Sequence, residues 1–241
     1  MNHQKLLLYT IAILMTLLLP IIVYCYSLEY VAFDNSFYKK EFLKHGVYSN
    51  LPGYNADHIN DAVLAYLKSS KSGKLIENDS FNRREKSHLL DVKNLFQKIF
   101  GIYRLSIALF LISSFALMIL SGFNFKLFLK RIFATLLIGS SLALIAAIFL
   151  FVVSTSGFNY AFLLFHENFF LAETYSFDPE FEKIVVLYPE SLFFDASIKI
   201  VSISILSSAM VFTASFVILF YFLGINFSRI FIAITDEENK K

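Results

Sequence analysis

Residues 132–153, IFATLLIGSSLALIAAIFLFVV, contain no charged side chain and decide the class of fold. A helix of this length can cross the hydrocarbon core of a bilayer, which is about 30 Å thick and needs about 20 apolar residues. Three further uncharged, mostly apolar runs occupy residues 6–26, 105–123 and 200–225. The sequence therefore predicts an all-α polytopic membrane protein with four transmembrane helices.

The composition agrees with this class, because 57% of the 241 residues are hydrophobic. The formal net charge is only +2, from 21 basic and 19 acidic residues, so nucleic acid is not an expected partner. The single cysteine, Cys25, cannot form an intrachain disulfide. The first apolar run is longer than the core of a signal peptide, about 7–15 residues, so we expect it to be a retained helix.

The short connection at residues 124–131, between the second and third runs, sets the predicted orientation. It carries three basic side chains and no acidic one, which places it in the cytoplasm by the positive-inside rule. Both termini are then cytoplasmic, and residues 27–103 and 154–199 lie outside, where they can form an extracytoplasmic cap. We expect one integral membrane domain over residues 1–241.

Two of the five histidines lie where a polar ring needs a partner or a task. His88 is on a predicted helix that leads into the second span, with Asp91 three residues later on the same face. A carboxylate in reach would fix the tautomer of the imidazole and raise its basicity. His166 lies within the aromatic run FLLFHENFF, residues 162–170, at the outer end of the third span. Both are candidate catalytic residues, and a structural hydrogen-bonding role is the alternative for each.

Other kinds of site are less well supported by the sequence. The two histidines with Asp91 and Glu167 could bind zinc, but there is no His-Glu-x-x-His pair and no cysteine ligand. No Gly-x-Ser-x-Gly turn marks a serine nucleophile. We therefore expect neither a metal nor a cofactor. Arg104, at the outer end of the second span, could bind a lipid phosphate, although snorkelling toward the interface explains it more simply.

The four-span layout and a set of short motifs resemble the lipoprotein intramolecular transacylase (Lit) family. The motifs that carry the resemblance are FYKKEF at 37–42, EKSHLLDVK at 85–93, FHENFF at 165–170, FDP at 177–179, LYPE at 187–190 and FFD at 193–195. Together they extend over nearly the whole chain. One departure is Tyr175, because members of the family tend to have a tryptophan in this region.

The resemblance implies an enzyme of the bacterial cytoplasmic membrane that acts on diacylated lipoproteins. It would move the sn-2 acyl chain of the diacylglyceryl group to the α-amino group of the N-terminal cysteine of the same lipoprotein, which yields a lyso-form lipoprotein. The expected partners are these lipoproteins and membrane lipids, and the active site would face the extracytoplasmic side.

For such an enzyme we expect the two histidines to transfer protons from the attacking amine and to the departing glycerol oxygen. Asp91 would orient His88, and Lys93 or the hydroxyl of Tyr26 or Tyr38 would stabilise the oxyanion. The competing interpretation is a non-enzymatic four-span envelope scaffold or accessory subunit, in which the histidines only satisfy hydrogen bonds.

Overall fold

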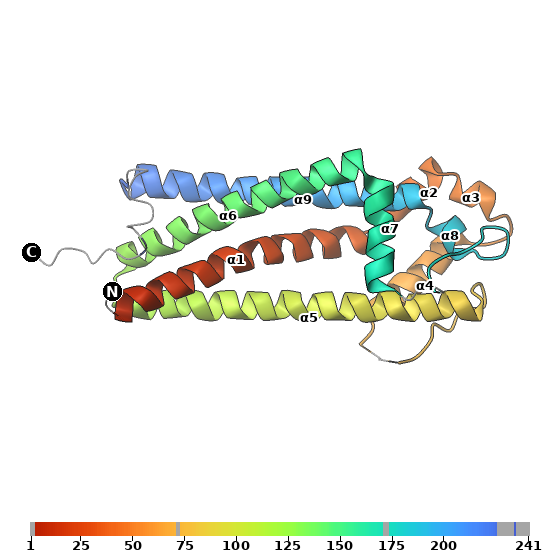
Figure 1. The fold of residues 1–241 in the computed structure, drawn as a ribbon, viewed down its shortest axis with the longest axis horizontal. Coiled ribbons are helices and arrows are strands. Elements are labelled where there is room, and N and C mark those ends of the chain that lie inside the picture. The colour runs from red at the N-terminus through yellow and green to blue at the C-terminus, as the bar shows by residue number, and fades with distance from the viewer. Residues whose placement is uncertain (1–2, 71–72, 171–173, 226–233, 235–241) are drawn as a thin grey trace, which may run out of the picture. The chain divides into compact units, whose positions relative to one another are not determined.

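The structure is a computed structural model of the chain, and it describes all residues except 1–2, 71–72, 171–173, 226–233 and 235–241. Every regular element in the described part of the chain is a helix, as the sequence predicted (Figure 1). The helices are α1 His3–Ala32, α2 Asn35–Lys44, α3 Val47–Asn50, α4 Ala56–Lys68, α5 Arg83–Leu120, α6 Phe125–Ser156, α7 Phe158–Phe169, α8 Ile184–Leu187 and α9 Glu190–Val217, which a π-helical turn, Ile218–Phe222, continues.

Four of these helices, α1, α5, α6 and α9 with its π-helical turn, are long and apolar enough to cross a membrane. They overlap the four predicted spans, but α5 ends at Leu120, before the predicted residue 123, and the π-helical turn after α9 ends at Phe222, before the predicted residue 225. The reason is local, because Gly122 and Gly224 have φ values of 60° and 64°. Glycine adopts this left-handed conformation readily and commonly ends a helix there.

Contacts divide the chain into two compact units. The first unit comprises residues 1–27, 102–150 and 201–241, and the second comprises residues 28–101 and 151–200. The prediction of one integral membrane domain stays a prediction.

The first unit consists of apolar lengths of α1, α5, α6 and α9. Leu8 and Met15 of α1 form a buried cluster with Leu117 of α5 and Ile132 of α6. Gly139 of α6 lies against α1 and leaves little room for any side chain, since a Cβ atom there would be about 3 Å from a neighbouring side chain. Small residues at such places let helices approach closely within a membrane.

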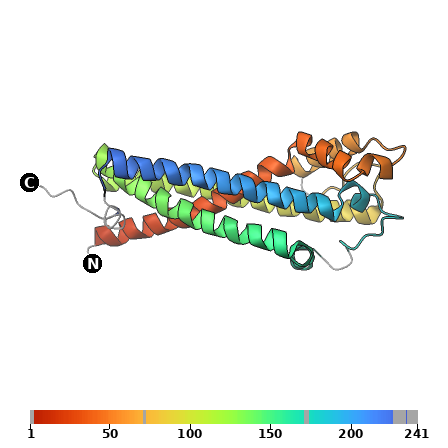
Figure 2. The ribbon, with the colours of Figure 1, turned by 90° about the horizontal axis from the view of Figure 1, so that it is seen from above.

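The second unit contains the shorter helices α2, α3, α4, α7 and α8. Phe42 and Val47 are fully buried in it. The hydroxyl of Tyr188 donates a hydrogen bond of 2.9 Å to Asn60 of α4, so the chain just after α8 is fastened to α4. After Gly157, α7 turns away from the end of α6, and Figure 2 shows α7 end-on. The aromatic run with His166 therefore lies on α7, which belongs to the second unit.

Candidate active site

Folding brings His88 of α5 and His166 of α7 together in the second unit. Their ring centroids are 6.5 Å apart, and the ring planes differ by only 16°. The two histidines that the sequence singled out separately therefore belong to one site. Their catalytic role stays a prediction.

A hydrogen bond defines the tautomer of His166. Its Nδ1 lies 2.7 Å from the backbone carbonyl oxygen of Phe162, one helical turn earlier. A carbonyl oxygen only accepts, so Nδ1 carries the proton and donates it. In the neutral ring, Nε2 then holds a free lone pair, which is the form that a general base requires.

Aromatic rings surround both imidazoles. Phe170 lies against both of them, with centroid distances of 4.8 Å to His88 and 5.5 Å to His166. Phe177 contacts His88, and Tyr175, the residue at the departure from the family pattern, is 5.4 Å from the ring of His166. These rings lower the polarity of the surroundings of His88, which favours its neutral form.

His88 is almost completely buried, with 8% of its surface exposed. It lies on the part of α5 that precedes the predicted span, at residues 105–123. Burial lowers the pKa of His88 to about 4, and the charge of a protonated His166 would act in the same direction. The Nδ1 atom of His88 is buried and has no hydrogen-bond partner among the residues that the structure describes. His88 is therefore neutral near pH 7 and is not held by a polar neighbour at Nδ1.

Asp91 was expected to orient the imidazole of His88, but it makes no hydrogen bond to the Nδ1 atom of that ring. Asp91 lies near Tyr66 of α4. Burial is the main cause that raises the pKa of Tyr66, and the negative charge of Asp91 raises it further. Burial also raises the pKa of Asp91 itself. A spacing of three residues on a helix places two side chains near each other, but it does not ensure that they form a hydrogen bond. The orienting role of Asp91 stays a prediction.

Both histidines line a cavity of about 700 Å³ in the second unit. This volume falls in the range of small-molecule sites, about 300–1,000 Å³. Most lining side chains are apolar, and they come from α1, α2, α4, α5, α7, α8 and α9 and from the segments beside them. They include Leu67, Leu95, Phe96, Phe162, Phe193 and Ile200. The cavity thus combines an apolar wall with two imidazoles.

Tyr38 is the one residue predicted to bind substrate that lines this cavity. Its hydroxyl donates a hydrogen bond of 3.0 Å to the carbonyl oxygen of Ala32 at the end of α1. Burial raises the pKa of Tyr38 above its ordinary value. An oxyanion role would require this hydroxyl to exchange the partner that it has in the structure.

The other three residues predicted to bind substrate are not among the described lining residues of the cavity. Lys93 is buried toward α4, where its ammonium donates a hydrogen bond of 2.7 Å to Ser69. Tyr26 and Arg104 belong to the first unit and are exposed. Their substrate-binding roles stay predictions.

Sequence reasoning overlooked Glu85, which lies one turn before His88 and is 1% exposed. Asn82 and Glu85 form a reciprocal cap at the start of α5: the Asn82 side chain accepts from the Glu85 backbone, and the carboxylate accepts from the Asn82 backbone. The second oxygen of the carboxylate accepts from the backbone N–H of Ile184, at 2.8 Å. The signal was readable, since Asn-x-x-Glu before an apolar periodicity marks a capping box.

An ion pair holds the segment that contains Ser176 and Glu182 against the first turn of α5. Arg84 pairs with the buried carboxylate of Glu182 at 3.0 Å and donates to the backbone carbonyl of Ser176. Its guanidinium also lies over the ring of Phe177. These contacts hold Phe177 beside His88 and so close one side of the site.

An apolar cavity with two adjacent imidazoles, in a chain with four helices able to cross a membrane, is suited to an enzyme that acts on a membrane-embedded substrate. The family model of the lipoprotein intramolecular transacylase Lit matches residues 13–194. The chain belongs to this family. It is therefore a multi-pass membrane enzyme, and the non-enzymatic alternative is rejected.

Solved structures agree with the family assignment. The structure of the membrane integral lipoprotein intramolecular transacylase Lit from Bacillus cereus aligns with a TM-score of 0.75 and 22% identity, over 92% of this chain and 97% of that chain. A structure of the same protein with a histidine-to-arginine mutation aligns with a TM-score of 0.71 and 21% identity, over 88% and 92%. At this identity the likeness shows the fold. No curated protein sequence gave a match.

Proposed function

We propose that this transacylase moves the sn-2 acyl chain of a diacylglyceryl lipoprotein to the α-amino group of that lipoprotein's N-terminal cysteine. The observation that supports it most is the pair of imidazoles, 6.5 Å apart, on the wall of an apolar cavity. The reaction forms one amide bond and breaks one ester bond. It needs only proton transfer and correct placement of two groups of the same substrate.

His166 is the general base of this proposal. An α-amino group has a pKa of about 7.7–8.0, so a neutral imidazole can take its proton as the nitrogen attacks the ester carbonyl. The proton then passes to the departing glycerol oxygen, which leaves the lyso-form product. His88 is the second proton-transfer group of this proposal, because its ring lies 6.5 Å from that of His166. The low pKa of His88 keeps its ring neutral before the reaction.

The apolar part of the cavity is suited to an acyl chain. Its lining consists largely of Leu, Ile, Val and Phe side chains, whose burial against a hydrocarbon is favourable by about 25 cal/mol per Å² of apolar surface. Diacylated lipoproteins are the proposed substrates, and the surrounding membrane lipids are the proposed environment from which they enter.

Mass spectrometry of lipoprotein N-termini tests the proposal directly. We expect cells that express this gene to contain N-acylated lipoproteins with one O-linked acyl chain, and cells without it to keep the diacylglyceryl form with a free amine. The His166→Gln variant should resemble the cells without the gene. Identical N-termini in the presence and absence of the gene would refute the acyl transfer.

The proposed orientation places the cavity on the extracytoplasmic side. Because Cys25 is the only cysteine, a Cys25→Ser chain provides a background without thiols. In it, Glu77→Cys should react in whole cells with an impermeant thiol reagent, and Lys126→Cys, on the basic connection, should react only after the membrane is opened. Both positions are exposed in the structure. The reverse pattern of labelling would refute this orientation, because it would place both termini outside the cell and the cavity on the cytoplasmic side.

A further inference from the structure

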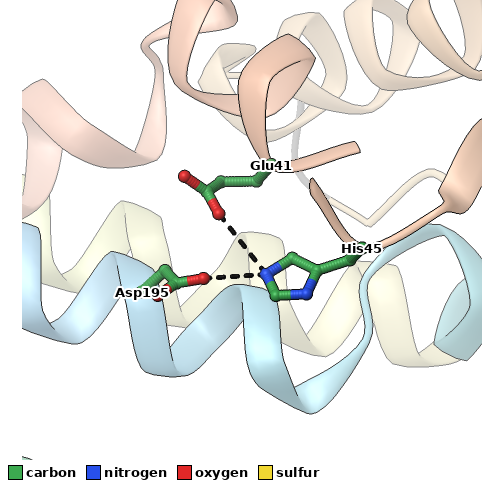
Figure 3. Close-up of side chains that lie close together, drawn as sticks. All are labelled: Glu41, His45 and Asp195. Carbon is green, nitrogen blue, oxygen red and sulfur yellow. Dashed lines mark hydrogen bonds and ion pairs between the residues drawn. The ribbon is translucent and has the colours of Figure 1, made fainter. Parts of the chain in front are cut away.

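A second cluster of polar side chains lies at the junction of α2 and α9 within the second unit. Glu41 of α2, His45 just after it, and Asp195 of α9 point toward one another (Figure 3). The Nε2 atom of His45 lies 2.7 Å from Asp195 Oδ2 and 3.4 Å from Glu41 Oε2. None of the three lines the cavity that holds the two catalytic candidates.

We propose that Glu41, His45 and Asp195 bind a divalent transition-metal ion, most favourably Zn²⁺. Each residue offers one ligand atom, and the three ligand atoms lie within 4.8 Å of one another. A set of one imidazole nitrogen and two carboxylate oxygens suits zinc better than calcium or magnesium, which prefer oxygen ligands alone. A water molecule would take the fourth tetrahedral position.

Two of the three ligand separations are close to those of a zinc site. Zinc lies about 2.0–2.1 Å from nitrogen and oxygen ligands, which places tetrahedral ligand atoms about 3.4 Å apart. The Glu41–His45 separation already has this value, at 3.4 Å. The His45–Asp195 separation of 2.7 Å would have to open by about 0.7 Å, which a side-chain rotation can provide.

Glu41 brings to the cluster a buried carboxylate oxygen that its neighbours satisfy incompletely. Glu41 is 5% exposed, and its Oε2 atom, which points into the cluster, is buried without a hydrogen-bond partner among the described residues. Its ion-pair contacts are long, at 3.4 Å to Nε2 of His45 and 3.7 Å to the ammonium of Lys44. A buried carboxylate oxygen without a partner is costly, and a metal ion at this point would remove that cost.

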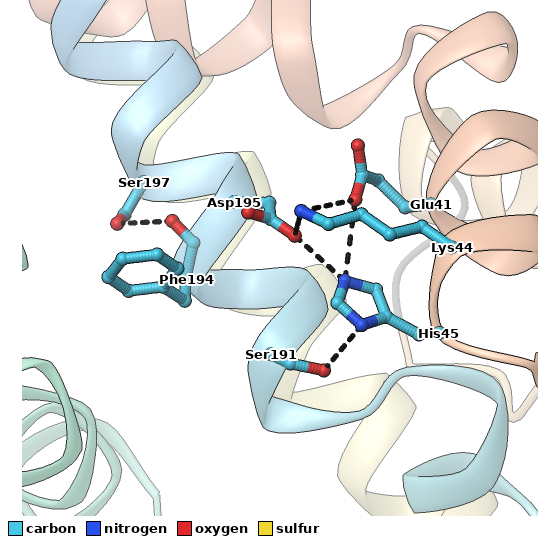
Figure 4. Close-up of polar contacts among 7 residues, drawn as sticks. All are labelled: Glu41, Lys44, His45, Ser191, Phe194, Asp195 and Ser197. Atoms are coloured by element: carbon cyan, nitrogen blue, oxygen red, sulfur yellow. Dashed lines mark hydrogen bonds and ion pairs between the residues drawn. The ribbon is translucent and has the colours of Figure 1, made fainter.

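The neighbours of the cluster also fit a metal site (Figure 4). The hydroxyl of Ser191 lies 3.0 Å from Nδ1 of His45, as expected of an outer partner that orients a histidine ligand. The ammonium of Lys44 lies 2.6 Å from Asp195 and 3.7 Å from Glu41, where it partly fills the place of the metal charge. Its side chain is 52% exposed and can move out into solvent when an ion binds.

The bound ion would join α2 to α9. Tyr38 of α2 and Phe193 of α9 both line the cavity, so a metal bridge between these helices would stiffen one of its walls. The site is structural in this proposal and does not depend on the acyl transfer. This proposal departs from the sequence-based expectation of no metal. Asp195 is distant from Glu41 and His45 in the sequence and comes close to them only in the folded chain.

Zinc binding by the purified full-length protein in detergent tests the proposal. After treatment with a chelator, the parent chain should bind one Zn²⁺ in competition with a chromophoric chelator, and its thermal unfolding temperature should rise with free zinc. His45→Gln and Asp195→Asn should each abolish this equimolar binding. Ser191→Ala should weaken it by about 10–100-fold, the usual effect of losing an outer-shell partner.

Control variants and a variant of the competing lysine complete the test. His58→Gln, at an exposed histidine of α4, and His166→Gln should bind zinc as the parent does. Lys44→Met removes only a half-exposed competing charge and should bind zinc more tightly than the parent. The proposal fails if the parent binds no equimolar zinc, if His45→Gln retains it, if His166→Gln loses it, or if Lys44→Met binds zinc more weakly.

Discussion

The His166→Gln variant is expected to form the N-acylated product at least about 10²-fold more slowly than the parent, the usual scale for losing a positioned proton-transfer group. Glutamine keeps the polarity and the approximate size of histidine. It cannot take a proton from the substrate amine, however. The fold should therefore persist while turnover is lost.

Turnover of a synthetic diacylated lipopeptide in detergent, followed by mass spectrometry, measures this effect. His58→Gln is the matched control, because it makes the same chemical change at an exposed histidine of α4 and should leave turnover unchanged. If His166→Gln kept its turnover but unfolded at a markedly lower temperature, His166 would be a packed aromatic neighbour of Phe162 and not a catalytic residue.

His88→Gln is expected to reduce turnover by a similar factor, about 10²-fold or more, because His88 lines the same cavity beside His166. This variant should also have a distinct pH dependence of stability. Burial lowers the pKa of His88 to about 4 from an ordinary value of 6.5, so the unfolded chain takes up the proton first as the pH falls. The difference corresponds to about 3 kcal/mol at low pH, an upper value that comes from 1.36 kcal/mol per pKa unit.

The sign of the pH effect follows from this order of protonation. Acidification from pH 6.5 toward pH 4 favours the unfolded parent, in which His88 is charged and hydrated. The variant has no such group, so its unfolding temperature should fall less than that of the parent between about pH 7 and pH 5. Thermal unfolding of both proteins in detergent measures the difference. Equal pH dependence of the two proteins would show that His88 is not a buried neutral histidine.

Local sequence determined the helices of this protein well. A run such as residues 132–153 has to be helical in a bilayer, because no water is present there to satisfy exposed backbone groups. The start of α4 at Asn55 and the start of α5 at Asn82 with Glu85 also depend on neighbours along the chain. Such features need no knowledge of the remaining fold.

The positions of polar partners were less predictable. Asp91 is three residues after His88, as a helix-face contact requires, but its carboxylate lies near Tyr66 instead. Lys93, which belongs to the same motif, bonds to Ser69. In both cases a residue of the α4 region provided the partner. Helical spacing limits which side chains can meet, and the packing of a second segment decides which of them do.

The sequence by itself determined that this chain is an all-helical membrane protein, and it singled out His88 and His166 by their local surroundings. Only the tertiary structure decided that the two rings lie 6.5 Å apart on one cavity, and that Asp195 joins Glu41 and His45. The physical reason is the range of the interactions. Helix formation and capping act over a few residues, whereas these sites depend on side chains from distant segments that are held together by the packing of α2, α5, α7 and α9.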